Sequence, residues 1–155
     1  MFSGKSYNPD SFGFLVYDIS RLFSLERERK IVAAGLELTA FESRTLVHVA
    51  RYQPARQVAL AESMNIEAMT LSGYLDRLEN RQLLRREPDP DDRRAKLIFL
   101  NESAVPVLDA LKHIALETIA EVSRALPPEE WEKFMGNLMT VRAHLREINQ
   151  ENRTS

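Results

Sequence analysis

The sequence predicts a mainly α-helical fold that carries one small β-hairpin. Apolar residues recur at steps of three and four along most of the chain, which is the period of amphipathic helices. Residues 83–100 break this period, because they form two short apolar and basic runs joined by Pro, Asp and Arg. Such runs are typical of two strands and a turn. An isolated hairpin is only marginally stable, so we expect this one to pack against the helices.

The composition fits one globular domain over residues 1–155. Of the 155 residues, 44% are hydrophobic and 28% are charged. The sequence contains no run of roughly 18 apolar residues, the length needed to span a membrane, and residues 1–6 lack the apolar segment of a secretory signal. The absence of cysteine excludes disulfides, thiolate zinc sites and cysteine nucleophiles. We therefore expect a cytoplasmic protein with no membrane partner.

The first two helices have recognisable ends. Asp10 or Ser11 is suited to cap a first helix, which we expect to end at Gly35. Thr39–Glu42 matches a capping box, in which the hydroxyl and the carboxylate each bind a backbone N–H that the helix leaves unpaired. This motif predicts a second helix that runs to about Arg51.

The next two helices form a predicted helix-turn-helix. The third is expected to begin near Gln57 and to stop at Asn65, because Asn tolerates the left-handed conformation of a tight turn. The fourth is expected to run from about Glu67 to Gln82, with a leucine stripe on one face. Its opposite face carries small, hydroxylated, aromatic and basic side chains: Thr70, Gly73, Tyr74, Arg77 and Arg81.

Two long helices are predicted after the hairpin. Asn101 or Ser103 is suited to cap the fifth, and Pro128 in the first turn, followed by acids, starts the sixth. One small core cannot use the apolar stripes of both terminal helices fully, so we expect them to pack partly in that core and partly against a second copy of the chain. The residues expected at this contact are Phe12, Leu15, Ile19, Trp131, Phe134, Leu138, Val141 and Leu145.

A helix-turn-helix followed by a basic hairpin is the order of elements in a winged helix-turn-helix. The charge distribution agrees with this class, because the net charge is only −2 while basic residues crowd residues 77–96. We therefore expect a DNA-binding part at about residues 39–100, with the hairpin as its wing. The N- and C-terminal helices, at about 10–34 and 103–150, are expected to form a dimerisation region.

Two motifs resemble the multiple antibiotic resistance regulator (MarR) family of winged-helix transcription factors. Leu75–Asn80 is similar to the end of the recognition helix of that family. Asp89–Lys96 is similar to its wing signature of an Asp, any residue and then an Arg, here Asp92, Arg93 and Arg94. The resemblance extends over residues 11–148, and two motifs in the right order are more specific than a lone helix-turn-helix pattern.

The resemblance implies a role for each residue of the interface. The fourth helix would enter the major groove of DNA, and Arg94 would enter the adjacent minor groove, where an Arg suits the strongly negative potential. Asp92 would orient Arg77. The DNA-binding residues are then expected to be Thr70, Ser72, Gly73, Arg77, Arg93 and Arg94.

Three positions depart from the family pattern. Gly73 stands where relatives often carry Arg, so the chain lacks a side chain there for bidentate contact with guanine. We therefore expect specificity to depend on Arg94 and on DNA shape. Gln82 replaces the usual Gly before the first strand of the hairpin, and Arg56 replaces the usual helix-capping Thr.

The sequence also bears on a ligand site, on metal binding and on catalysis. The resemblance implies a cleft for small aromatic acids, and Phe14, Tyr17 and Arg21 are the residues expected to line it, because an Arg pairs a carboxylate while rings stack. The three histidines show no metal-ligand spacing, and no catalytic constellation or Gly-rich phosphate loop is present. We expect no metal, no cofactor and no enzyme activity.

The predicted function is that of a homodimeric repressor of a pseudo-palindromic DNA operator, released by a small aromatic or phenolic ligand. One alternative is a protein-interaction module in which the basic wing of the same fold binds an acidic partner. A second alternative is an enzyme that acts on a small molecule in the helical cleft. A specificity ratio near one over random DNA would favour the first alternative, and turnover of a bound aromatic acid would favour the second.

Overall fold

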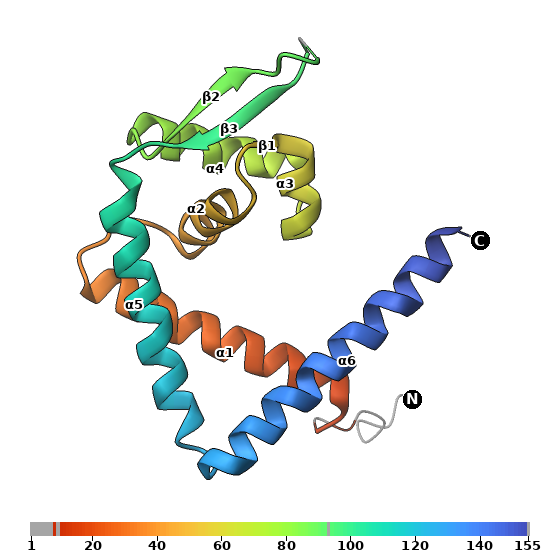
Figure 1. Cartoon of the computed structure of the whole chain (residues 1–155). Coiled ribbons are helices and arrows are strands. Elements are labelled where there is room, and N and C mark those ends of the chain that lie inside the picture. The colour runs from red at the N-terminus through yellow and green to blue at the C-terminus, as the bar shows by residue number, and fades with distance from the viewer. Residues whose placement is uncertain (1–7, 9, 93, 155) are drawn as a thin grey trace, which may run out of the picture. The chain divides into compact units, whose positions relative to one another are not determined.

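The computed structural model describes residues 8, 10–92 and 94–154 (Figure 1). Six helices and a three-stranded antiparallel sheet are described in these residues. The elements are α1 (Phe12–Ala33), α2 (Ala40–Tyr52), β1 (Ala55–Arg56), α3 (Gln57–Met64), α4 (Ala68–Asn80), β2 (Leu84–Pro88), β3 (Lys96–Leu100), α5 (Ala104–Ser123) and α6 (Pro128–Thr154). The mainly helical fold class is confirmed. No helix in the described part of the chain is long and apolar enough to cross a membrane.

The chain divides into two compact units, residues 1–115 and 116–155. In the first unit, α4 lies between the hairpin and α2 (Figure 1). Its core is built from aliphatic side chains that point inward from the helices and the sheet, among them Ile31, Leu46, Leu60, Leu71, Leu75, Leu78, Leu84, Ile98 and Leu111. The second unit contains the end of α5 and the whole of α6.

Local chemistry explains most helix ends. Thr39 and Glu42 form the predicted capping box, in which Thr39 Oγ1 accepts the Glu42 N–H at 3.2 Å and Glu42 Oε2 accepts the Thr39 N–H at 2.9 Å. Asn65 ends α3 with φ 53°, and Gly35 follows α1 with φ 68°, as expected. The side-chain donors of Asn101 and Ser103 bond the Gln82 carbonyl.

Two features differ from the expectation. Helix α4 ends at Asn80 rather than at Gln82, because Gln82 itself adopts a left-handed φ of 59°. The sheet also gains the short strand β1, which pairs antiparallel with β3 and places Ala55 opposite Ile98. Two residues are too few to show an alternating pattern, so sequence periodicity could not reveal this strand.

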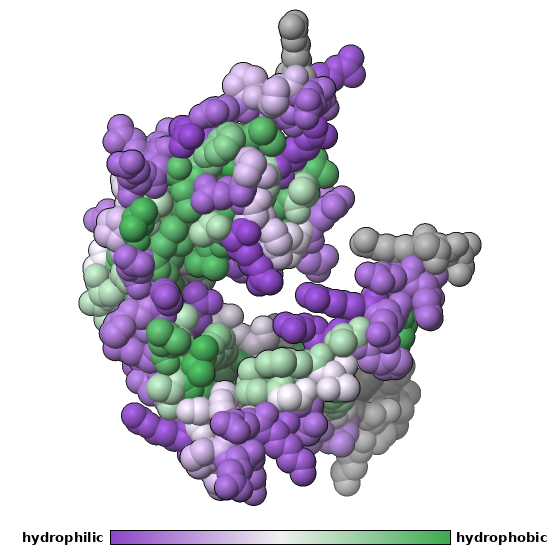
Figure 2. Space-filling view, viewed as in Figure 1, coloured by the Kyte–Doolittle hydropathy of each residue, from purple (hydrophilic) through white to green (hydrophobic). Residues whose placement is uncertain are grey.

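The hairpin is a regular antiparallel pair with a tightly bonded turn. Leu84 stands opposite Leu100, and Pro88 stands opposite Lys96. At the base of the turn, the Asp89 N–H donates to the Ala95 carbonyl at 3.1 Å. Hydrophilic residues gather towards the tip of the hairpin at the top of Figure 2, and apolar residues are visible nearer its base. The predicted wing is therefore an ordered two-stranded element that packs on α4.

Candidate nucleic-acid interface

Helix α4 turns its leucines inward and its polar residues outward. Leu71, Leu75 and Leu78 have no exposed surface, so they fix the rotation of the helix on the core. Among the predicted DNA-binding residues, Thr70 and Arg77 are exposed, and Ser72 and Gly73 are half-buried. The outward face is therefore a polar, basic surface next to the wing.

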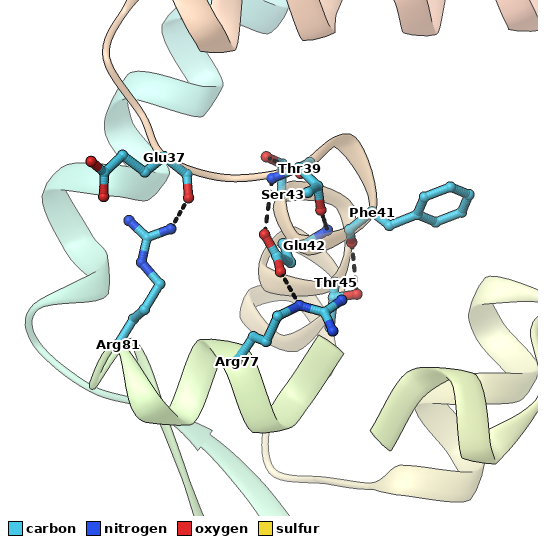
Figure 3. Close-up of polar contacts among 8 residues, drawn as sticks. All are labelled: Glu37, Thr39, Phe41, Glu42, Ser43, Thr45, Arg77 and Arg81. Carbon is cyan, nitrogen blue, oxygen red and sulfur yellow. Dashed lines mark hydrogen bonds and ion pairs between the residues drawn. The ribbon is translucent and has the colours of Figure 1, made fainter. Parts of the chain in front are cut away.

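Arg77 is paired with Glu42 rather than with the predicted Asp92 (Figure 3). Arg77 Nε donates to Glu42 Oε1, while the other oxygen of this carboxylate completes the capping box of α2. Asp92 instead accepts the N–H of Arg94 at 3.0 Å, which shapes the turn of the wing. The expectation for Asp92 was wrong because the packing of α4 on α2, which brings Glu42 to Arg77, cannot be deduced from a wing motif.

The Glu42 carboxylate is held in its charged form. Its side chain is only 7% exposed, and this burial raises the pKa. The hydrogen bonds from the Thr39 backbone and from Arg77 together outweigh the effect of burial, so the pKa of Glu42 lies below its ordinary value of 4.5. The Glu42 carboxylate therefore stays ionised at neutral pH.

An aromatic stack supports the other side of Arg77. The rings of Phe41 and Tyr74 are stacked, with centroids 5.5 Å apart. The Arg77 Cζ atom lies 5.0 Å from the centroid of the Tyr74 ring, within reach of a cation–π interaction. The guanidinium also extends back over Gly73, where a Cβ atom would lie 3.7 Å from Arg77 Nη1. Residues of α2 and α4 thus hold this side chain in one place.

Arg81 ties the end of α4 to the linker between α1 and α2. Its Nη1 atom donates to the backbone oxygen of Glu37 (Figure 3). Arg77 on α4 and Arg81 directly after this helix are therefore both bonded to the short segment from Glu37 to Glu42.

Two ion-pair clusters anchor the wing to the helix-turn-helix. Arg86 on β2 bonds both Asp76 and Glu79 on α4, and the hydrogen bond from Arg86 lowers the pKa of Glu79. Arg56 Nε donates to Asp89 Oδ2 at 2.6 Å. The N–H of Asp91 and the Arg56 guanidinium lower the pKa of Asp89, whose side chain is only 3% exposed. Arg56, at the position where the family pattern has a capping Thr, makes no side-chain cap and links α3 to the wing instead.

A basic groove lies between α3 and the wing. It has a volume of about 770 Å³, and its cations are Arg56, Arg86, Arg94 and Lys96. Arg94 is exposed on the turn. Arg93 lies outside the described residues.

The residues expected to bind a ligand do not form an enclosed site within the first unit. Phe14 and Tyr17 are exposed and line a shallow depression at the start of α1, and Arg21 is paired with Asp18 at 3.2 Å. A smaller and more enclosed cavity of about 130 Å³ lies further along α1, against the start of α2. Its lining includes Arg27, Phe41 and Arg44. Arg27 Nε is buried, and no described residue accepts a hydrogen bond from it.

The residues predicted at the dimer contact are largely exposed in the single chain. On α1, Phe12, Leu15 and Ile19 are 62%, 44% and 58% exposed. Of the residues predicted on α6, Phe134, Leu138, Val141 and Leu145 are exposed, whereas Trp131 is half-buried. The Trp131 ring lies 5.7 Å from that of Phe134. No group of three potential metal ligands occurs among the described residues.

The order of these elements, with a polar recognition helix and a basic hairpin anchored to it, defines a winged helix-turn-helix protein. Residues 38–96 match the model of the MarR family. Over these residues the chain is similar to the MarR family.

Several solved structures share the fold of the chain over most of its length. A probable transcriptional regulator from Pseudomonas aeruginosa is 27% identical, with a TM-score of 0.72 over 85% of this chain and 97% of that one. MepR from S. aureus, solved as a DNA complex, is 24% identical, with a TM-score of 0.73 over 86% and 98% of the two chains. MarR from E. coli in its apo form is 18% identical, with a TM-score of 0.78 over 87% and 98%.

Proposed function

We propose that the protein is a homodimeric repressor that binds a pseudo-palindromic DNA operator through α4 and the wing. The observation that supports this most strongly is the anchoring of the wing to α4 by Arg86, Asp76 and Glu79. This cluster holds the exposed face of α4 and the Arg94 turn as one unit, so both can meet adjacent grooves without a large loss of entropy. The similar MepR was solved in complex with DNA.

In this proposal the two surfaces have different tasks. Helix α4 lies in the major groove, and Thr70, Ser72, Gly73 and Arg77 face the base edges. The exposed Arg94 enters the neighbouring minor groove, and Arg93 beside it belongs to the same contact. The repressor obstructs transcription by occupying its operator.

The proposed dimer covers the apolar residues that the single chain leaves exposed. Leu138, Val141 and Leu145 follow one another at steps of three and four on α6, which suits a helical seam. We expect Leu138→Glu to shift the protein towards monomer in sedimentation analysis, and the neighbouring exposed substitution Asn137→Asp to leave the dimer intact. A wild-type protein that sediments as a monomer at micromolar concentration would contradict the dimer.

DNA binding is tested by fluorescence anisotropy across a salt series. The probes are the intergenic duplex upstream of the gene and a scrambled duplex of the same composition. We expect the wild type to bind the first duplex more tightly by at least about 10³-fold. Arg94→Ala should weaken this binding and make the salt slope shallower by about one, whereas Arg146→Ala on α6 should change neither.

The same experiment distinguishes the alternatives. Equal, weak binding to both duplexes, unaffected by Arg94→Ala, would contradict the proposal and favour a protein-interaction module.

We also propose that a small aromatic acid releases the DNA. The Arg27 cavity supports this better than the predicted site at Phe14, Tyr17 and Arg21, because a buried donor without a partner favours an anion. Its volume of about 130 Å³ is close to that of cavities that bind benzene. Benzoate should weaken DNA binding by the wild type but not by Arg27→Leu. Equal sensitivity of the wild type and this variant would contradict the assignment of the cavity.

A further inference from the structure

We infer that Arg77, positioned by Glu42 and Tyr74 over Gly73, reads a guanine in the major groove and determines the specificity of α4. This inference rests on the proposed DNA binding. It assigns base reading to a residue whose partner lies on another helix, and it assigns positioning roles to Glu42 and Tyr74. It also differs from the expectation that specificity depends on Arg94 and on DNA shape.

Gly73 provides the space that the Arg77 guanidinium occupies. The side chains of a helix lean towards its N-terminus, so residue 77 reaches back over residues 73 and 74. Arg77 Nη1 lies 3.7 Å from the position that a Cβ atom on residue 73 would take. A long side chain at residue 73 would compete for this place. The chain therefore presents a guanidinium above residue 73 although residue 73 is glycine.

The contacts of Arg77 leave one edge of its guanidinium available for a base. The hydrogen bond to Glu42 uses Nε, so it does not occupy the two terminal amino groups. The side chain remains 52% exposed, whereas the Glu42 side chain is 7% exposed. An edge with two parallel N–H donors matches O6 and N7 of guanine, which is the commonest specific contact between proteins and DNA.

The two partners of Arg77 restrict its motion before DNA binds. An unrestrained Arg loses rotamer entropy when it docks, and this loss lowers affinity and specificity. Here the Tyr74 ring supports one face of the guanidinium and Glu42 fixes Nε. Tyr74 is itself stacked on Phe41, so its ring is also held.

The charge of Glu42 makes it possible to distinguish base reading by Arg77 from simple attraction of Arg77 to a phosphate. The carboxylate balances the charge of Arg77, so the pair contributes little to the salt dependence of binding. An Arg that only neutralised a phosphate would steepen the slope of log K against log salt by about 0.9. Arg77 should therefore affect the choice of base more than the salt slope.

The test is selection of binding sites from a pool of random duplexes, followed by affinity measurements on single-base variants of the selected site. The wild type should select a guanine at one position in each half-site. Arg77→Lys should lose most of the preference at that position, a roughly 5- to 150-fold discrimination, and retain the preferences elsewhere.

Glu42→Gln tests the positioning role, because it keeps a hydrogen-bond acceptor and removes the charge. It should reduce the guanine preference several-fold, while affinity for scrambled DNA rises and the salt slope steepens by about 0.9. Glu37→Gln is the matched control, since it removes the same charge nearby and Arg81 bonds only the backbone oxygen of Glu37. It should leave the guanine preference unchanged. Thermal unfolding of each variant checks that it is folded.

The outcomes separate this inference from the proposed function. If the wild type selects no sequence, both fail. If it selects a site and Arg77→Lys weakens binding to all sequences equally, or leaves the guanine preference intact, the reading role of Arg77 is wrong while the proposed function stands. If Glu42→Gln changes the guanine preference no more than Glu37→Gln does, the positioning role is wrong.

Discussion

At the scale of single residues, the arginines near α4 differ in what holds them. Arg77 and Arg86 are bonded to carboxylates, and Arg81 is bonded to a carbonyl. Arg94 is exposed, and its backbone N–H is bonded to Asp92. A restrained Arg is suited to read a base at a fixed position, while an exposed Arg on a turn is suited to follow a groove of variable width.

Gln82 is a strained residue whose replacement should stabilise the protein. Its φ of 59° lies in the left-handed region, which costs a non-Gly residue about 1–2 kcal/mol. Gln82→Gly should raise the free energy of unfolding by about 1 kcal/mol in urea titrations, since the carbonyl that accepts from Asn101 and Ser103 remains. Asn65→Gly, at φ 53°, should raise the free energy of unfolding by less, because Asn tolerates this region. A loss of stability in Gln82→Gly would contradict this account.

Glu42 should make the stability of the fold depend on pH. Its pKa in the folded state is below the ordinary value of 4.5, so its contribution is complete above about pH 4.5 and is lost as pH falls through the folded value. Glu42→Gln should lower the free energy of unfolding by about 1–2 kcal/mol at pH 7. The loss of stability on going from pH 5 to pH 3 should be smaller than in the wild type. If the free energy of unfolding fell equally with pH in both proteins, Glu42 would not be the source of the pH dependence.

At the scale of elements, ion pairs hold the wing in place. Asp89 is almost fully buried, and it joins Arg56 at the start of α3 to the N–H of Asp91 in the turn. We expect Asp89→Asn to speed hydrogen exchange of the backbone amides in the turn and to weaken DNA binding. Glu87→Gln is the control, because Glu87 and Arg85 form an exposed pair, each 49% exposed, which contributes little. If the turn amides exchanged at the same rate in both variants, the proposal that Asp89 holds the wing in place would be wrong.

The elements that the sequence predicted well are those whose signals are local. The capping box of α2, the left-handed Asn65 after α3 and the polar turn of the hairpin each involve residues a few positions apart. The pairing of Arg77 with Glu42 joins residues 35 positions apart, and that of Arg56 with Asp89 joins residues 33 apart. Such contacts depend on how the helices pack, which sequence periodicity does not determine.

The candidate site also has one part that the sequence predicted and one part that it did not. The exposed face of α4 could be predicted from its leucine spacing, and the structure places Arg77 there. The residue that orients Arg77 could not be predicted, although Glu42 was already identified as a capping residue. One carboxylate with two oxygens performs both tasks, and the capping motif alone gives no sign of the second.

At the scale of the whole molecule, the proposed binding to a pseudo-palindromic operator needs two chains. Apolar residues remain exposed on α1 and on α6, and a single recognition helix covers only one half-site. A dimer related by a two-fold axis would cover the exposed apolar residues and place two copies of α4 on the DNA.

Hydroxyl-radical footprinting on the selected duplex examines the dimer, α4 and the wing in one experiment. A homodimeric winged-helix repressor should give two protected half-sites about one helical turn apart, each flanked by a protected minor groove. Arg94→Ala should lose the flanking protection and keep the central one. A single protected half-site at saturating protein, or flanking protection that is unchanged in Arg94→Ala, would contradict a dimeric winged-helix repressor that reads DNA in this way.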